Sequence, residues 1–358
     1  MEIGSIIEIF PKDLFKENQA GDGIYPFEKG ESWNFNYFNT GRAAIEALLN
    51  YLKKEGNKKL WLPSYDCSSV YDAAKRAGVE IALYPVDKDL LIDNGVFDSL
   101  QRNDILYLVN FFGRGETENT YMAIRKAKDN GVVVIEDLSL SLLSAGENIG
   151  FGDYVIGSVR KWLPIPDGGF IASRQSLPQF TKADAANDYT LYYFAAQVMK
   201  SQYLQDITLD KQVFLNLSNK GIEKLFSDYT IREISEISKR VIDATNLNEV
   251  AEIRKRNYIY LYECLCNIKE VKLMVKPIAE RVALGVVICV EDRDALFKHL
   301  IQNGVYCNIH WRENESTVQF EDSRYLSQHC LTLPCDQRYE TEQMNHIYKT
   351  IKDFYHHV

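Results

Sequence analysis

Short apolar segments that alternate with helical patterns restrict the fold of this 358-residue chain more than any other feature. The segments are rich in β-branched residues, as VVVIED at 132–137 illustrates. Continuous apolar strands separated by helices are typical of a mostly parallel sheet that helices cover on both faces, so we expect an α/β fold. Strands are expected at 35–39, 60–63, 79–86, 105–112, 132–137, 154–159 and 169–172. Helices are expected at 41–52, 68–77, 96–101 and 118–130.

The second half of the chain has a different pattern. Residues 182–267 are polar and helical, and they are rich in Tyr, Lys and Glu. Strands are then expected at 271–276, 281–290 and 305–311, with helices at 293–303 and 342–355. We therefore predict a large α/β domain over 1–245, with a helical insertion at about 182–228. A smaller α+β domain is predicted over 246–358.

Charge and hydropathy exclude several classes of partner. The chain has 41 basic and 50 acidic residues, a net charge of −9, which argues against nucleic acid or an anionic membrane as the main partner. The first residues, MEIGSIIEIF, lack the basic start of a secretory signal. The longest apolar stretch, near 282–290, is about half as long as a membrane-spanning helix. A cytoplasmic location is expected.

Cysteines and histidines narrow the possible chemistry. The seven cysteines are odd in number and form no CxxC pair, so neither a disulfide framework nor a metal site is expected. All six histidines lie at or after His299, so the preceding part of the chain cannot build a Ser/His/Asp triad or a histidine metal cluster. Catalysis there has to use Lys, Asp, Ser, Thr, Tyr or a cofactor.

Four features lie at the expected carboxyl edge of the sheet, where α/β proteins bind ligands. Thr40-Gly41 begins a helix and could bind an anion such as phosphate, although a plain Thr cap is also consistent. Asn110 could bind a ligand oxygen or form a turn. Asp137 could pair with a cationic ring nitrogen or cap the next turn. Lys161 could be desolvated and suited to imine chemistry, or it could be a surface lysine.

Together these features match one ligand. Pyridoxal phosphate has a phosphate that needs an anion site and a ring nitrogen that needs an anion. Its phenolic oxygen needs a donor, and its aldehyde needs a lysine. The order of an anion site, Asn110, Asp137 and Lys161 therefore predicts this cofactor.

At these residues the chain resembles the DegT-type sugar aminotransferases, which are fold-type I pyridoxal-phosphate enzymes. The similarity covers roughly 35–175 and 245–355, and its most specific part is Asp137 followed by Lys161-x6-Gly-Gly. The segments that carry it are FNTGRAAIEALL, LWLPSYDCSSVYDAAKRAGVEIALYPVD, LVNFFGR, VVVIEDLSLSLLS, GDYVIGSVRKWLPIPDGGF, GVYCNIHW and LTLPCDQRYETEQMNHIYKTI.

The resemblance implies a role for each matching position. Lys161 would bind the cofactor aldehyde and move protons, and Asp137 would pair with the pyridinium nitrogen. The remaining cofactor contacts would be Thr40, Gly41, Arg42 and Ser158 at the phosphate and Asn110 at the phenolic oxygen.

Some positions depart from the family pattern. The family has Gln or His where this chain has Leu140, so one cofactor contact is missing. Cys67 stands where an aromatic residue commonly stacks on the ring, and Tyr65 could compensate. The family's Asn-containing loop is replaced by the helical insertion.

Two further residues are candidates for binding substrate. His310 lies where family members often place a substrate-facing histidine. Arg338 could hold a donor carboxylate, or it could form a structural pair with an acid such as Asp336. The resemblance implies a homodimer that transfers an amino group from an amino acid, glutamate being expected, to a keto sugar. The sugar would be nucleotide-linked, in surface polysaccharide or amino-sugar biosynthesis.

Two alternatives stay open. One is a lyase or dehydratase that uses the same cofactor, although the related dehydratases carry His in place of the lysine. The other is a degenerate protein that binds without catalysis, which Leu140 and Cys67 would favour.

Overall fold

The alternating segments form a seven-stranded sheet in the computed structural model, which describes residues 2–10, 14, 33–314 and 317–356. The strand order is β2-β8-β7-β6-β5-β3-β4, and neighbouring strands from β7 to β4 are parallel. β8 runs antiparallel to both of its neighbours, so the sheet is mostly parallel, as predicted. The strands are β2 (Asn34–Phe38), β3 (Lys59–Pro63), β4 (Glu80–Tyr84), β5 (Ile105–Val109), β6 (Val133–Asp137), β7 (Tyr154–Ser158) and β8 (Gly169–Ser173).

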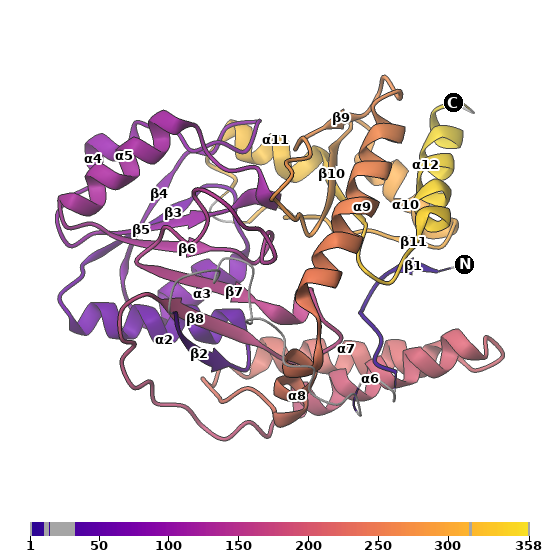
Figure 1. The fold of residues 1–358 in the computed structure, drawn as a ribbon, viewed down its shortest axis with the longest axis horizontal. Helices are drawn as coiled ribbons and strands as arrows, with labels where there is room; N and C mark the ends of the chain where they lie inside the picture. Colours follow the sequence, from indigo (N-terminus) through magenta and orange to yellow (C-terminus); the bar gives the residue numbers. More distant parts are fainter. Residues whose placement is uncertain (1, 11–13, 15–32, 315–316, 357–358) are drawn as a thin grey trace.

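Helices on both sides of this sheet bury its apolar residues (Figure 1). α2 packs on β7 and β8 and also against α3, while α4 packs against α5. The central strands are mostly buried, and β5, with the sequence ILYLV, has all five residues buried. The helices are α2 (Gly41–Lys54), α3 (Ser68–Ala77), α4 (Val96–Ser99) and α5 (Glu118–Asp129).

The helical insertion and the region after it are also helical, as expected. They comprise α6 (Asp188–Gln205), α7 (Lys211–Ser227), α8 (Glu236–Ala244) and α9 (Leu247–Leu265). α6 and α7 pack together as a helical hairpin, visible below α9 in Figure 1. None of the helices in the described residues combines the length and the apolar character that crossing a membrane requires.

The C-terminal part forms a second, antiparallel sheet of order β12-β10-β9. The helices and strands of this C-terminal part are β9 (Lys272–Leu273), β10 (Gly285–Cys289), α10 (Arg293–Gln302), β11 (Val305–Tyr306), α11 (Glu321–His329), β12 (Cys330–Pro334) and α12 (Thr341–His356). α11 and β12 were not predicted, because EDSRYLSQH is mostly polar and CLTLP ends in a proline that suggests a turn.

The start of the chain packs with its end. β1 (Ile3–Gly4) pairs in parallel with β11, although the two strands are far apart in sequence (Figure 1). A division of the chain at residue 245 stays a proposal, since this pairing crosses it.

Candidate active site

Two cavities meet at the carboxyl edge of the large sheet. The sheet-edge cavity has about 860 Å³ of space not filled by protein atoms, and its walls include Thr40, Asp66, Asp137 and Ser158. The polar cavity, with about 1330 Å³, lies between the insertion, the N-terminal residues and the C-terminal sheet. Arg160 and Lys161 line both cavities, so Lys161 is accessible from either side.

The first turn of α2 forms one end of the sheet-edge cavity. Thr40 is the N-cap, and its hydroxyl oxygen accepts a hydrogen bond from the N–H of Ala43 at 3.1 Å. Among the described residues no acceptor is found for the N–H groups of Gly41 and Arg42, which are therefore open to an anion at the positive end of the helix. A Cβ at Gly169 would lie 2.4 Å from the Gly41 nitrogen, so a glycine is required for β8 to approach this turn.

Asp137 ends β6 with a fixed orientation. The hydroxyl of Tyr107 donates to Asp137 Oδ2 at 2.7 Å, and the N–H of Ser139 donates to Oδ1 at 2.7 Å. The side chain is buried but lines the sheet-edge cavity. Two donors thus hold this carboxylate in one position at the wall of the cavity.

Lys161 lies in a short 3-10 turn, Val159–Lys161, directly after β7. No hydrogen bond or ion pair joins its ammonium group to another residue in the described part of the chain. The same turn explains why Arg160 also faces the site, although the two side chains would point apart on a strand. The guanidinium group of Arg160 lies 6.0 Å from the ring centre of Tyr193.

The other expected cofactor residues have different positions. Ser158 and Cys67 line the sheet-edge cavity, and Cys67 Sγ lies 3.0 Å from Ser69 Oγ. Tyr65 does not line it, because its ring is buried at 1% exposure between Phe111 and Trp311. Stacking by Tyr65 is therefore not supported.

Asn110 is not among the residues that line this cavity. It lines a separate small cavity together with Glu116 and Glu136, and its Oδ1 atom is buried without a hydrogen-bond partner. Only its backbone connects to the site, through the N–H that donates to Asp137 O at 3.0 Å. The chain continues from β5 into a 3-10 helix at Phe111–Gly113. Because Asn110 lines the separate cavity, a contact of its side chain with a phenolic oxygen in the sheet-edge cavity is not supported.

The side chain of Arg42 points toward the end of α7. Its guanidinium group lies 4.7 Å from the ring centre of Tyr229 and donates to Asp228 O at 3.2 Å. Burial is the main cause that lowers the pKa of Arg42. Arg42 still lines the sheet-edge cavity, and its backbone N–H is the group that can reach an anion at the helix start.

Two wall residues of the sheet-edge cavity had no signal in the sequence. Asp66 precedes Cys67 in the loop between β3 and α3, and it is 4% exposed. Trp311 follows β11 and reaches the same cavity from the C-terminal part of the chain. Its indole contacts Tyr65 edge to face, which places an aromatic side chain beside Cys67 in the wall.

His310 lines the polar cavity rather than the sheet-edge cavity. Its Nδ1 lies 2.9 Å from Thr332 Oγ1. Burial, and then the positive charge of Lys161, lowers the pKa of His310 to about 3. The ring is therefore neutral at physiological pH, and it can accept or donate a hydrogen bond without carrying charge.

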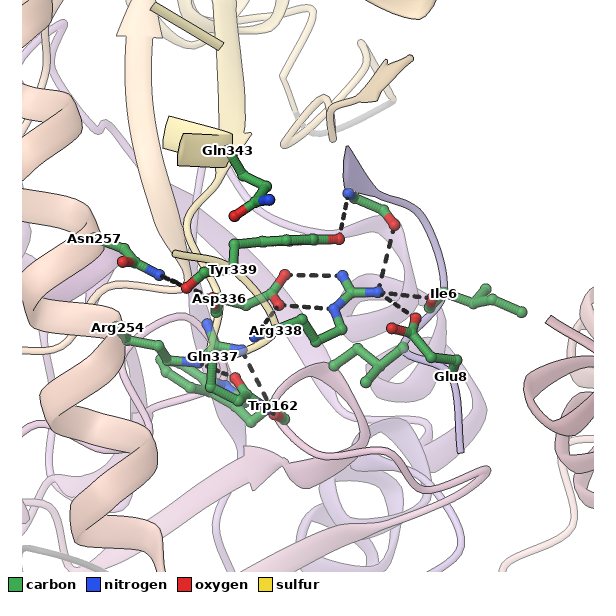
Figure 2. Close-up of polar contacts among 12 residues, drawn as sticks. Ile6, Glu8, Trp162, Arg254, Asn257, Asp336, Gln337, Arg338, Tyr339 and Gln343 are labelled. Atoms are coloured by element: carbon green, nitrogen blue, oxygen red, sulfur yellow. Dashed lines mark hydrogen bonds and ion pairs between the residues drawn. The ribbon is translucent and has the colours of Figure 1, made fainter. Parts of the chain in front are cut away.

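Arg338 also lines the polar cavity, but its guanidinium group is already hydrogen-bonded to other residues of the protein (Figure 2). Two bonds of 2.7 and 2.8 Å join it to both carboxylate oxygens of Asp336, and another of 2.8 Å reaches Glu8. It also donates to the carbonyl of Ile6 at 3.0 Å. The structural pair with Asp336 is thus present, and binding of a donor carboxylate by Arg338 is not supported.

Comparison of the sequence with models of known families and with curated proteins finds no match. Solved structures are similar, however. The sugar aminotransferase CalS13 from Micromonospora echinospora aligns with a TM-score of 0.62 and 13% identity, over 89% of this chain and 87% of that one. The chain has the fold of the sugar aminotransferases.

Two further structures have the same fold. A DegT DnrJ EryC1 StrS aminotransferase from Brucella abortus gives a TM-score of 0.61 with 17% identity, over 90% of this chain and 86% of that one. GDP-4-keto-6-deoxy-D-mannose-3-dehydratase of E. coli, solved with bound hydrated PLP, gives 0.64 with 15% identity, over 90% and 88%. The fold, that of fold-type I aminotransferases, is therefore the one that the sequence predicted.

Proposed function

We propose that this protein is an aminotransferase of the DegT type that uses pyridoxal 5'-phosphate. It transfers an amino group from an amino acid, glutamate in our proposal, to a keto sugar. We further propose that the sugar is nucleotide-linked and that the product enters surface polysaccharide or amino-sugar synthesis. A homodimer in the cytoplasm is part of the same proposal.

The observation that carries this proposal is a free ammonium group and a fixed carboxylate in one cavity. Lys161 has no partner in the described part of the chain, and the carboxylate of Asp137 is held by Tyr107 and Ser139. The start of α2 adds two open N–H groups for a phosphate. The amine, the carboxylate and the two N–H groups fit, respectively, the aldehyde, the ring nitrogen and the phosphate of pyridoxal phosphate.

Bound there, pyridoxal phosphate supplies an aldehyde that reacts with amines and a ring that withdraws electrons from the substrate carbon. The negative charge of Asp137 favours a protonated ring nitrogen. Lys161, which is accessible from both cavities, can give and take a proton at the substrate carbon. The backbone N–H groups of Gly41 and Arg42 bind the phosphate and so keep the ring in one place.

The polar cavity is our proposed site for the keto substrate. It continues from Lys161 and contains hydroxyl, amide and imidazole groups from Ser218, Asn308 and His310. Since His310 is neutral, it suits the hydroxyl groups of a sugar better than an anion. Arg160, like Lys161, is a cation that lines both cavities.

Reductive labelling tests the proposal directly. The purified protein is mixed with pyridoxal phosphate, reduced with borohydride and digested, and the modified peptide is identified by mass spectrometry. The label is expected on Lys161, and Lys161→Ala should lose it, whereas Lys126→Ala, a change at an exposed lysine of α5, should keep it. A wild-type protein with no label on Lys161 would refute the proposed chemistry.

A dehydratase is the second candidate, because a structural neighbour is a PLP-bound dehydratase. Lys161 argues against a dehydratase, since the related dehydratases carry His at this position. A lysine there can move the proton at the substrate carbon that amino transfer requires. The fate of the sugar separates the two, since a dehydratase neighbour was also solved with a PLP-glutamate adduct. Only an aminotransferase transfers the amino group of glutamate to a keto sugar. Water release from the sugar without amination would favour the dehydratase.

A further inference from the structure

Asp66 is a carboxyl group of the sheet-edge cavity that the proposed mechanism leaves unused. Its Oδ1 accepts the N–H of Cys67 at 2.6 Å, whereas Oδ2 is buried and has no partner among the described residues. The carbonyl of Asp66 accepts the side-chain amide of Asn314 at 3.2 Å, which fixes the loop. A buried polar atom without a partner is costly, so Oδ2 is available for a group that enters the cavity.

The surroundings of Asp66 disfavour its negative charge. Burial raises the pKa of Asp66 well above its ordinary value, and the charge of Asp137 raises it further. The Cys67 N–H and the Lys161 ammonium act in the opposite direction, but they do not reverse the shift. The remaining titratable groups nearby, the phenols of Tyr84 and Tyr107, bring no positive charge. Burial and the charge of Asp137 therefore both favour the uncharged form of this side chain, which has an O–H to donate.

The proposed cofactor requires such a donor. The phenolic oxygen is next to the aldehyde with which Lys161 would react, and this oxygen needs a hydrogen-bond donor. Leu140 lines the cavity but has no polar atom, and Asn110 lines a different cavity. Asp66 lines the same cavity as Lys161 and Asp137 and has a free oxygen.

We propose that Asp66 is an uncharged hydrogen-bond donor to the phenolic oxygen of bound pyridoxal phosphate, in place of the donor that Leu140 and Asn110 do not supply. The inference rests on the proposed function, because it needs the cofactor in this cavity. Asp66 acts here as a residue that contacts the cofactor, and it takes no part in covalent steps.

The first test uses the protein without cofactor. Asp66→Asn keeps the shape and cannot ionise, so the thermal midpoints of the variant and the wild type are compared from pH 5 to pH 8. On this proposal Asp66 ionises in the unfolded chain but not in the folded chain. The thermal midpoint of the wild type should therefore fall relative to that of the variant as the pH rises, on the order of 2 °C per pH unit. Asp72→Asn, at an exposed position of α3, should show no such trend. Parallel curves for Asp66→Asn and the wild type would overturn the uncharged state.

The second test measures cofactor affinity through the visible absorbance of the loaded protein. Asp66→Ala should weaken pyridoxal phosphate binding by about 10- to 100-fold, the effect of losing a hydrogen bond to a charged oxygen, whereas Asp66→Asn still donates and should stay within about threefold. With 3-deoxypyridoxal phosphate, which lacks the phenolic oxygen, Asp66→Ala and the wild type should bind equally.

The outcomes separate this inference from the proposed function. Equal weakening by Asp66→Asn and Asp66→Ala, or an Asp66→Ala defect that persists with the deoxy analogue, overturns the donor role while the label on Lys161 still supports the function. Absence of that label overturns the function and the cofactor contact together. The pH comparison without cofactor still decides whether Asp66 is uncharged.

Discussion

Replacement of Arg338 by leucine should destabilise the protein far more than loss of an ordinary ion pair. The guanidinium joins Asp336 and Glu8, both of which are buried, in a contact that also holds the N-terminal residues (Figure 2). Burial raises the pKa of Asp336, but the charge and hydrogen bonds of Arg338 lower it from 3.8 to about 2. That net change alone corresponds to about 2 kcal/mol. Since Glu8 also loses a partner, we expect a total loss of about 3–5 kcal/mol, as for other broken buried pairs.

Equilibrium unfolding in urea, followed by circular dichroism, measures this loss. Arg256→Leu is the matched control, because Arg256 pairs with Glu340 at 2.7 Å with side chains that are 49% and 72% exposed. Such a surface pair contributes about 0–1 kcal/mol. A cost for Arg338→Leu no greater than that of Arg256→Leu would refute the reasoning.

The stability deficit of Arg338→Leu should also change with pH in a defined direction. In the wild type the lowered pKa of Asp336 contributes stability above pH 3.8, and this contribution is lost as the pH falls toward 2. Without Arg338, burial disfavours the ionised form of Asp336 in the folded state. The deficit of Arg338→Leu should therefore be larger at pH 7 than at pH 4, and a deficit that does not change with pH would contradict this account.

Three further predictions concern the cavities. Gly169→Ala places a Cβ 2.4 Å from the Gly41 nitrogen, so it should cost about 1–3 kcal/mol in unfolding experiments and weaken binding of pyridoxal phosphate in absorbance titrations. The lowered pKa of His310 makes wild-type stability fall as the pH drops from 6.5 toward 3, so thermal melts of His310→Gln should show a smaller acid loss. Asp137→Ala should keep the fold by circular dichroism and lose turnover by orders of magnitude; unchanged turnover would exclude its proposed role.

The large sheet was predictable from sequence because each buried strand is a continuous apolar run. VVVIED and LYLVNFF carry that signal on their own, and they place Asp137 at the edge where ligands bind. β12 and α11 carry no such signal, since β12 is stabilised mainly by pairing with β10, which lies some 45 residues earlier in sequence. Long-range pairing of this kind cannot be derived from local pattern.

The candidate site was predictable to the extent that it depends on strand ends. Thr40, Asp137, Ser158 and Lys161 line one cavity, as their positions after strands suggested. The 3-10 turn after β5 could not be foreseen, because it depends on Phe112 adopting a backbone angle φ of 54°. Asn110, directly before that turn, lines a separate cavity. Trp311 was missed because its contact depends on how the C-terminal part packs.

The polar cavity has one wall made from the two ends of the chain. Gly4 and Ile6 lie beside Arg338, and the hydroxyl of Tyr339 accepts the N–H of Gly4 at 2.6 Å. During synthesis on the ribosome, the large sheet can fold while the last residues are still being added. The cavity that we assign to the substrate is complete only after the C-terminal segment has emerged and paired with the N-terminal strand. A nascent or prematurely terminated chain would therefore form the large sheet without forming the substrate cavity.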